Sequence, residues 1–217
     1  MSKLFEATSI KSLTLANRFI RSATYSGLAS EDGFVTPELT LVMVGLAKGQ
    51  VGLIITGHAY VRPEGQAGPR QLGIYDDALV PGLTEMVEAV HGAGGKIVVQ
   101  LAHAGLAAPS KLTGQEALGP SAAKGYYPSE PRKLTETQID ELVEAFGQAA
   151  GRAKAAGFDG VQVHAAHGYL LSQFLSPAFN QRTDAFGGSV EKRAAFPARV
   201  VRAVRQAVGQ ERPILVK

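Results

Sequence analysis

Two histidines and a tyrosine share one short segment, His164-Ala165-Ala166-His167-Gly168-Tyr169. His164 and His167 could donate hydrogen bonds to one substrate oxygen, and the phenol of Tyr169 could deliver a proton to a carbon nearby. Two donors on a carbonyl oxygen stabilise the enolate-like charge that builds there when a hydride adds to a conjugated C=C bond. No side chain carries a hydride, so this chemistry requires a redox cofactor. The segment therefore predicts reduction of an activated alkene.

The same histidines allow two other interpretations. A His-x-x-His pair beside a strand can bind a metal ion, with His103 as the third ligand of a barrel lyase. No carboxylate ligand stands close to these histidines in the sequence, so we expect no metal. Histidines at a strand end can also be ordinary polar residues without a chemical role.

Strand-like and helix-like stretches alternate along the chain. Apolar runs predict strands at residues 19–23, 51–56, 96–101, 160–164 and 213–217. Helices are predicted between them, beginning near residues 36, 80, 135 and 189. Thr36 and Thr135 are the expected caps, Thr135 in a capping box with Gln138. Pro197 is expected to kink or split the last helix.

This alternation indicates a parallel sheet, either doubly wound or closed into a (β/α)₈ barrel. No Gly-x-Gly-x-x-Gly supports the doubly wound sheet. Polar side chains collect where the strands end, as on the active-site face of a barrel. They are Ser22, Thr24, Thr56, His58, Gln100, His103, His164, His167 and Lys217. A complete barrel has eight strands, so we predict a partial TIM barrel of about five strands.

Residues 105–134 are rich in Gly, Pro and Ser, and they predict a long loop between the third strand and the third helix. Loops of this length are usually functional lids or disordered. Tyr126 and Tyr127 in this loop are candidates for the wall of a substrate pocket.

The composition excludes several classes of protein. The net charge of +3, without a run of Lys or Arg, argues against a nucleic-acid partner. The chain has no cysteine, so it has neither a disulfide nor a thiolate metal site. No signal peptide fits the N-terminus and no apolar stretch has the length of a membrane span, so we expect a cytoplasmic protein.

Several stretches resemble the old yellow enzyme family of FMN-dependent oxidoreductases, in its branch near the 2,4-dienoyl-CoA reductases and small ene-reductases. The longest and most specific stretch runs from His164 to Gly188. The others are residues 15–24, 49–55, 100–105 and 156–161. Together they span nearly the whole chain in the family's order. The resemblance implies that residues 1–217 are the N-terminal portion of a single FMN-binding barrel.

The resemblance also implies a role for each matching residue. His164 and His167 match the pair that grips the substrate carbonyl, and Tyr169 matches the proton donor. Gln100 matches a carboxamide that pairs with the flavin pyrimidine, and Lys217 matches a basic residue near flavin N1 and O2. The full set implied to bind the cofactor is Ser22, Ala23, Thr24, Tyr25, His58, Gln100 and Lys217.

Three positions depart from the family's pattern. His58 falls where the family usually has a small residue whose backbone touches the flavin. Leu106 replaces an Arg that many members carry, which leaves the packing of that loop open. Some small ene-reductases have a Cys at the position of Tyr25, and this chain cannot tune a flavin in that way.

We therefore expect an oxidoreductase that uses FMN, with NADH or NADPH, to reduce the C=C bond of an enone-type small molecule. The family's phosphate-binding loops and the cysteines for an iron–sulfur cluster lie beyond the matched region. The alternative is a catalytically silent partial barrel. With unpaired sheet edges it would form a homo-oligomer or pair with a complementary barrel fragment.

Overall fold

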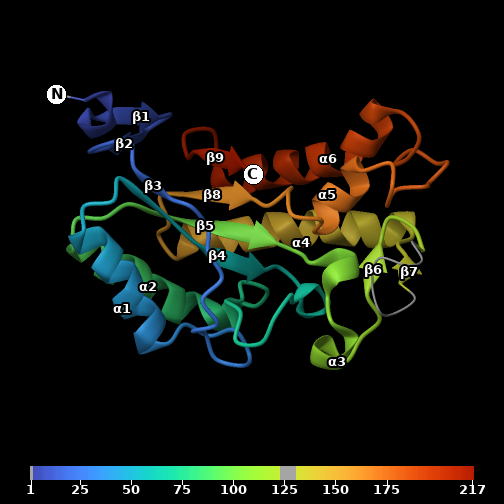
Figure 1. Ribbon diagram of the computed structural model, residues 1–217, viewed down its shortest axis with the longest axis horizontal. Helices are drawn as coiled ribbons and strands as arrows, with labels where there is room; N and C mark the ends of the chain where they lie inside the picture. Colours follow the sequence, from blue (N-terminus) through green and yellow to red (C-terminus); the bar gives the residue numbers. More distant parts are fainter. Residues whose placement is uncertain (1, 123–130) are drawn as a thin grey trace.

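The computed structural model describes residues 2–122 and 131–217, and its centre is a curled, all-parallel sheet (Figure 1). The strands lie in the order in which they occur along the chain, whereas a doubly wound sheet reverses its order at a switch point. The sheet is therefore a partial (β/α)₈ barrel, as predicted. Its strands are β3 (Ile20–Arg21), β4 (Leu53–Tyr60), β5 (Ile97–Ala102), β8 (Gly160–Val163) and β9 (Ile214–Val216).

The helices pack side by side against one face of this sheet, α1 on α2, α2 on α4 and α4 on α6. Their bounds are Pro37–Lys48 for α1, Val80–Gly92 for α2, Glu136–Ala155 for α4 and Val190–Val208 for α6. The main core lies between these helices and the alternate strand residues that face them, among them Ile54, Val99, Leu101, Val161 and Val163. This is the outer layer of a barrel.

The predicted helix caps are confirmed. The Thr36 hydroxyl accepts the Leu39 N–H at 3.2 Å, and Thr135 and Gln138 form the reciprocal capping box. The expected split at Pro197 is wrong, because α6 runs through this residue as one helix. The proline removes one backbone hydrogen bond, and the burial of Phe196 and Val200 against the core offsets that loss.

An N-terminal hairpin covers the other face of the sheet at the start of the strands. Its strands, β1 (Thr8–Ile10) and β2 (Leu13–Leu15), pair antiparallel and were not predicted. Leu13 and Leu15 bury against three strand residues, Leu53, Ile55 and Val98. In Figure 1 the hairpin lies at the tails of the strand arrows, away from their heads.

Strand β4 is longer than predicted and contains a bulge. Ile54 and Ala59 both pack into the helix-facing core although five positions separate them, an odd spacing that regular alternation forbids. The register with β5 shifts between Ile55 and His58, which turns His58 to the inner face opposite Gln100. His58 therefore lies within β4, not beyond the end of that strand as predicted, whereas Thr56 and Gln100 lie within their strands as predicted.

The excursion after β5 has more structure than the predicted loop. It contains α3 (Ser110–Thr113) and two short parallel strands, β6 (Leu118–Gly119) and β7 (Arg132–Lys133). Leu106 is buried here, and its side chain fills the space where Gly119 lacks a Cβ. Tyr126 and Tyr127 lie outside the described residues. Helix α5 (Leu170–Leu175) follows β8 and was not predicted.

The buried guanidinium of Arg182 binds the segment between β5 and α4 to the rest of the molecule. It donates to the carbonyl oxygens of Pro120 at 3.0 Å and Leu134 at 2.6 Å. It also pairs with both carboxylate oxygens of Asp184.

Within the described ranges, no helix has both the length and the apolar character needed to cross a bilayer.

Candidate active site

A tight turn after β8 brings the two histidines and the tyrosine together. The His164 N–H still bonds the Leu101 carbonyl at 3.0 Å, as if it extended the strand. His167 and Gly168 then adopt left-handed backbone angles, φ 57° and 70°, which reverse the chain into α5. A left-handed histidine is uncommon outside constrained sites. The ring centroids lie 5.0 Å apart for His164 and His167, and 5.1 Å apart for His164 and Tyr169.

His164 is a neutral hydrogen-bond donor. Burial, followed by the nearby His167, His58 and Lys217, lowers its pKa to about 4. Its Nδ1 accepts the Ala166 N–H at 3.4 Å, which places the remaining proton on Nε2. A neutral imidazole with Nε2–H can donate to a substrate oxygen without carrying a positive charge.

His58 joins this group from β4. Its Nε2 lies 3.3 Å from the Tyr169 hydroxyl, and its ring stacks on Tyr25 with centroids 5.5 Å apart. The Tyr25 hydroxyl in turn bonds the Pro69 carbonyl. Burial lowers the pKa of His58, its own backbone partly opposes this shift, and the charge of His167 adds to it. The bulge in β4 is what brings this third imidazole to the inner face.

Two carboxamides lie side by side on the inner face next to these rings. The Gln100 Nε2 donates to the Gln162 Oε1 at 2.6 Å, and both side chains are buried. The backbone N–H of Gln100 bonds the Thr56 hydroxyl at 3.2 Å. The sequence reading overlooked Gln162, although a polar residue two positions before His164 in an apolar strand marks the same face.

Lys217 brings a positive charge to the same edge of the sheet. Its ammonium donates to the Ser22 hydroxyl at 3.1 Å, and its carbonyl accepts the Ala165 N–H at 2.8 Å. The segment Ser22–Tyr25 runs past β3 along the inner edge, with Ala23 packed on the floor of the barrel. The Thr24 carbonyl passes so close to Gly57 that a Cβ there would lie 3.0 Å from its oxygen.

His103 is buried apart from this group. Its Nδ1 accepts the Gly105 N–H at 3.0 Å, and burial followed by the charge of Arg62 lowers its pKa to about 3. Across the part of the chain that the structure describes, no three His, Asp or Glu side chains are placed to hold a metal ion. His103, His164 and His167 therefore do not come together as the alternative metal interpretation required.

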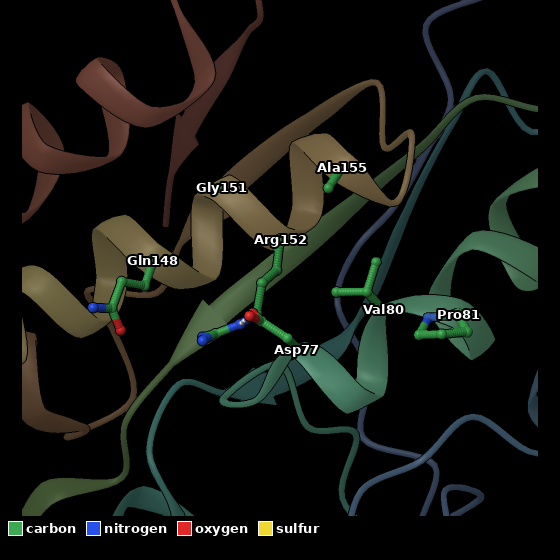
Figure 2. Close-up of a pocket in the computed structure, with 7 residues that line it drawn as sticks. All are labelled: Asp77, Val80, Pro81, Gln148, Gly151, Arg152 and Ala155. Atoms are coloured by element: carbon green, nitrogen blue, oxygen red, sulfur yellow. Dashed lines mark hydrogen bonds and ion pairs between the residues drawn. The ribbon is translucent and has the colours of Figure 1, made fainter.

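A surface hollow lies elsewhere, outside the barrel between α2 and α4 (Figure 2). Asp77 and Arg152 face each other across it with 2.6 Å between Oδ1 and Nε, so their charges satisfy one another. Its lining includes one carboxamide, that of Gln148, but no histidine or tyrosine. We place the candidate active site at the inner face, where eight of the predicted side chains meet: Ser22, Tyr25, His58, Gln100, His164, His167, Tyr169 and Lys217.

Comparisons with known proteins bear on the family and the fold of this chain. Residues 3–217 match the NADH:flavin oxidoreductase / NADH oxidase family. The chain is 41% identical over 214 residues to an NADH oxidase of Thermoanaerobacter brockii, covering 97% of this chain and 33% of the relative. It is 46% identical over 193 residues to an NADPH dehydrogenase of Halalkalibacterium halodurans, covering 88% and 56%.

A solved structure, morphinone reductase in complex with tetrahydroNAD, superposes with a TM-score of 0.91 at 36% identity. That match covers 100% of this chain and 63% of morphinone reductase. The chain thus spans less than two thirds of each of these three proteins.

Proposed function

Since this chain belongs to the NADH:flavin oxidoreductase / NADH oxidase family, we propose that it forms the N-terminal portion of an FMN-binding barrel that reduces the C=C bond of α,β-unsaturated carbonyl compounds. FMN with NADH or NADPH as reductant is the cofactor system of this family. The observation that carries the specific reaction is the meeting of a neutral His164 with His167 and Tyr169 at one turn.

The inner-face residues fit the cofactor. Gln100 and Gln162 present buried carboxamide groups, and a carboxamide both donates and accepts, as the pyrimidine edge of a flavin requires. Lys217 and Ser22 supply a positive charge and a hydroxyl at the same edge. When bound, FMN supplies the hydride acceptor and donor that no side chain can be. The segment Ser22, Ala23, Thr24 and Tyr25, together with His58, completes the proposed cofactor contacts.

The remaining residues act on the substrate. His164 donates from Nε2 to the carbonyl oxygen, and His167 supplies the second donor. Because His164 is neutral, its donation gains most when negative charge develops on the oxygen, so it stabilises the transition state more than the ground state. Tyr169 gives its proton to the carbon that becomes the new C–H.

An FMN titration of the purified 217-residue chain tests the cofactor assignment. We expect a saturable change in the flavin absorbance and fluorescence spectra, and at least about tenfold weaker binding for Gln100→Ala. Gln148→Ala, in the hollow outside the barrel, is the matched control and should bind FMN like the parent. Absence of binding by a chain with native circular dichroism would overturn the assignment, and equal binding by Gln100→Ala would remove Gln100 from the site.

A second candidate function is supported by the sheet edges. Ile20 on β3 and Val216 on β9 are 45% and 58% exposed, and both belong to edge strands. Apolar edges of this kind favour association with a second copy or a complementary fragment. Light scattering at increasing protein concentration, together with the FMN titration, distinguishes the two candidate functions. A catalytically silent partial barrel self-associates without binding FMN.

A further inference from the structure

His58 contacts the proposed proton donor directly, and nothing in the family comparison assigns it a part in proton transfer. Its Nε2 lies 3.3 Å from the Tyr169 hydroxyl. The Tyr25 ring stacks on the His58 ring at 5.5 Å and 21°, and the His164 ring lies nearly parallel to it at 6.3 Å and 19°. Both neighbours restrain the imidazole, which limits the directions of its nitrogens.

The backbone around His58 is held as firmly as the ring. The Gln71 carboxamide, itself buried, donates to the His58 carbonyl at 3.1 Å and accepts the Ala67 N–H at 2.7 Å. The His58 carbonyl oxygen, which lies next to the imidazole, thus already accepts a hydrogen bond from Gln71.

The surroundings of the ring decide which nitrogen carries the proton. Nδ1 of His58 is buried and has no hydrogen-bond partner among the residues that the structure describes. A buried N–H donor without an acceptor is rarer and more costly than an under-satisfied acceptor. The proton of the neutral ring therefore belongs on Nε2, which points at the phenol oxygen.

We propose that His58 is a positioning residue for proton transfer: its Nε2–H donates to the Tyr169 oxygen, orients the phenol and stabilises the phenolate that forms when the proton leaves. This inference rests on the proposed function, in which Tyr169 protonates the substrate carbon. In this step the Tyr169 O–H bond breaks and its proton forms the new C–H bond on the substrate carbon. The electron pair of the O–H bond stays on the phenolate oxygen. The hydrogen bond from His58 strengthens as that charge appears.

Other groups around Tyr169 also affect its titration. His164 faces it from the end of β8, and Lys217 and His167 lie within electrostatic range of His164. Any test must therefore change His58 alone and preserve the rest. His58→Gln does this best, because a carboxamide can place an N–H near the position of Nε2, whereas His58→Leu removes the donor.

The experiment is an NMR titration of the flavin-free chain labelled with ¹³C at tyrosine Cζ. The Tyr169 signal is identified by its loss in Tyr169→Phe. We expect the titration midpoint of the Tyr169 phenol to rise by about one pH unit in His58→Leu and to return most of the way in His58→Gln. An unchanged midpoint in His58→Leu would overturn the proposal, and a lower midpoint would show that His58 accepts the bond instead of donating it.

A second measurement needs no substitution. The ¹⁵N shifts of the His58 imidazole in the native chain should show a bare Nδ1 and a protonated Nε2, and the opposite tautomer would overturn the proposal. Both measurements are made without FMN. Their failure is therefore distinct from failure of the proposed function, which the FMN titration reports.

Discussion

Replacing His103 by Asn should remove much of the acid sensitivity of the fold. The His103 ring is fully buried, and its Nδ1 accepts the Gly105 N–H at 3.0 Å. An Asn carboxamide oxygen can accept the same N–H, so the turn after β5 keeps its hydrogen bond. The substitution thus removes a titrating group while retaining its one structural contact through Nδ1.

The magnitude follows from the lowered pKa. Burial lowers the pKa of His103 to about 3 in the folded chain, whereas an unfolded histidine titrates near pH 6.5. Between these values only the unfolded chain binds the proton, so stability is complete above about pH 6.5 and is lost as the pH falls. From pH 7 to pH 5 this one residue removes about 2 kcal/mol from the free energy of unfolding.

Urea unfolding at pH 5, 6, 7 and 8 measures this difference. His103→Asn should lose about 2 kcal/mol less than the parent between pH 7 and pH 5, whatever its stability at pH 7. Leu101→Ala is the control: it opens a cavity in the core, costs about 2–5 kcal/mol, and leaves the pH dependence unchanged. Parallel pH profiles for parent and His103→Asn, with equal m-values, would refute the reasoning.

Three further predictions concern the site and its support. His164→Ala or His167→Ala should weaken binding of phenol-type ligands and slow enone reduction about 10²-fold, and parental rates in both variants would contradict the substrate role. Tyr169→Phe should slow oxidation of the reduced flavin by the enone about 10²–10⁴-fold with NAD(P)H oxidation largely intact; an equal loss in both half-reactions indicates misfolding. Arg182→Met leaves the Pro120 and Leu134 carbonyls without their donor and should lower the free energy of unfolding by about 3–5 kcal/mol, measured in urea at pH 7.

The local signals in the sequence predicted the outer layer of the barrel well. Thr36 and Thr135 cap their helices because a hydroxyl at that position satisfies an N–H whatever the rest of the chain does. The apolar runs of β4, β5 and β8 became strands for a similar reason, since these three are buried on both faces, whereas the edge strands β3 and β9 stay partly exposed. The hairpin of β1 and β2 escaped notice because its polar residues outnumber the two buried leucines, Leu13 and Leu15, and only the sheet above explains their burial.

The site was less predictable because it depends on register. Period-two alternation from Ile54 would send His58 toward the helices, and only the bulge against β5 turns it inward. Gln71 gives no local sign of its bond to the His58 carbonyl, since the two residues belong to different elements. The contacts that hold His58 join strands and loops that are distant along the chain, so local sequence patterns do not predict them.

The inner face combines neutral imidazoles with one positively charged ammonium. Burial keeps His164 and His58 neutral, while Lys217 beside Ser22 carries the positive charge. A cationic imidazole at the substrate end would bind an anion in the ground state and gain little as the reaction proceeds. Neutral donors instead respond to charge that develops during the reaction, whereas in the proposed site Lys217 would face the anionic ring of a reduced flavin. Acidification that protonates His164 would therefore impair the proposed reaction.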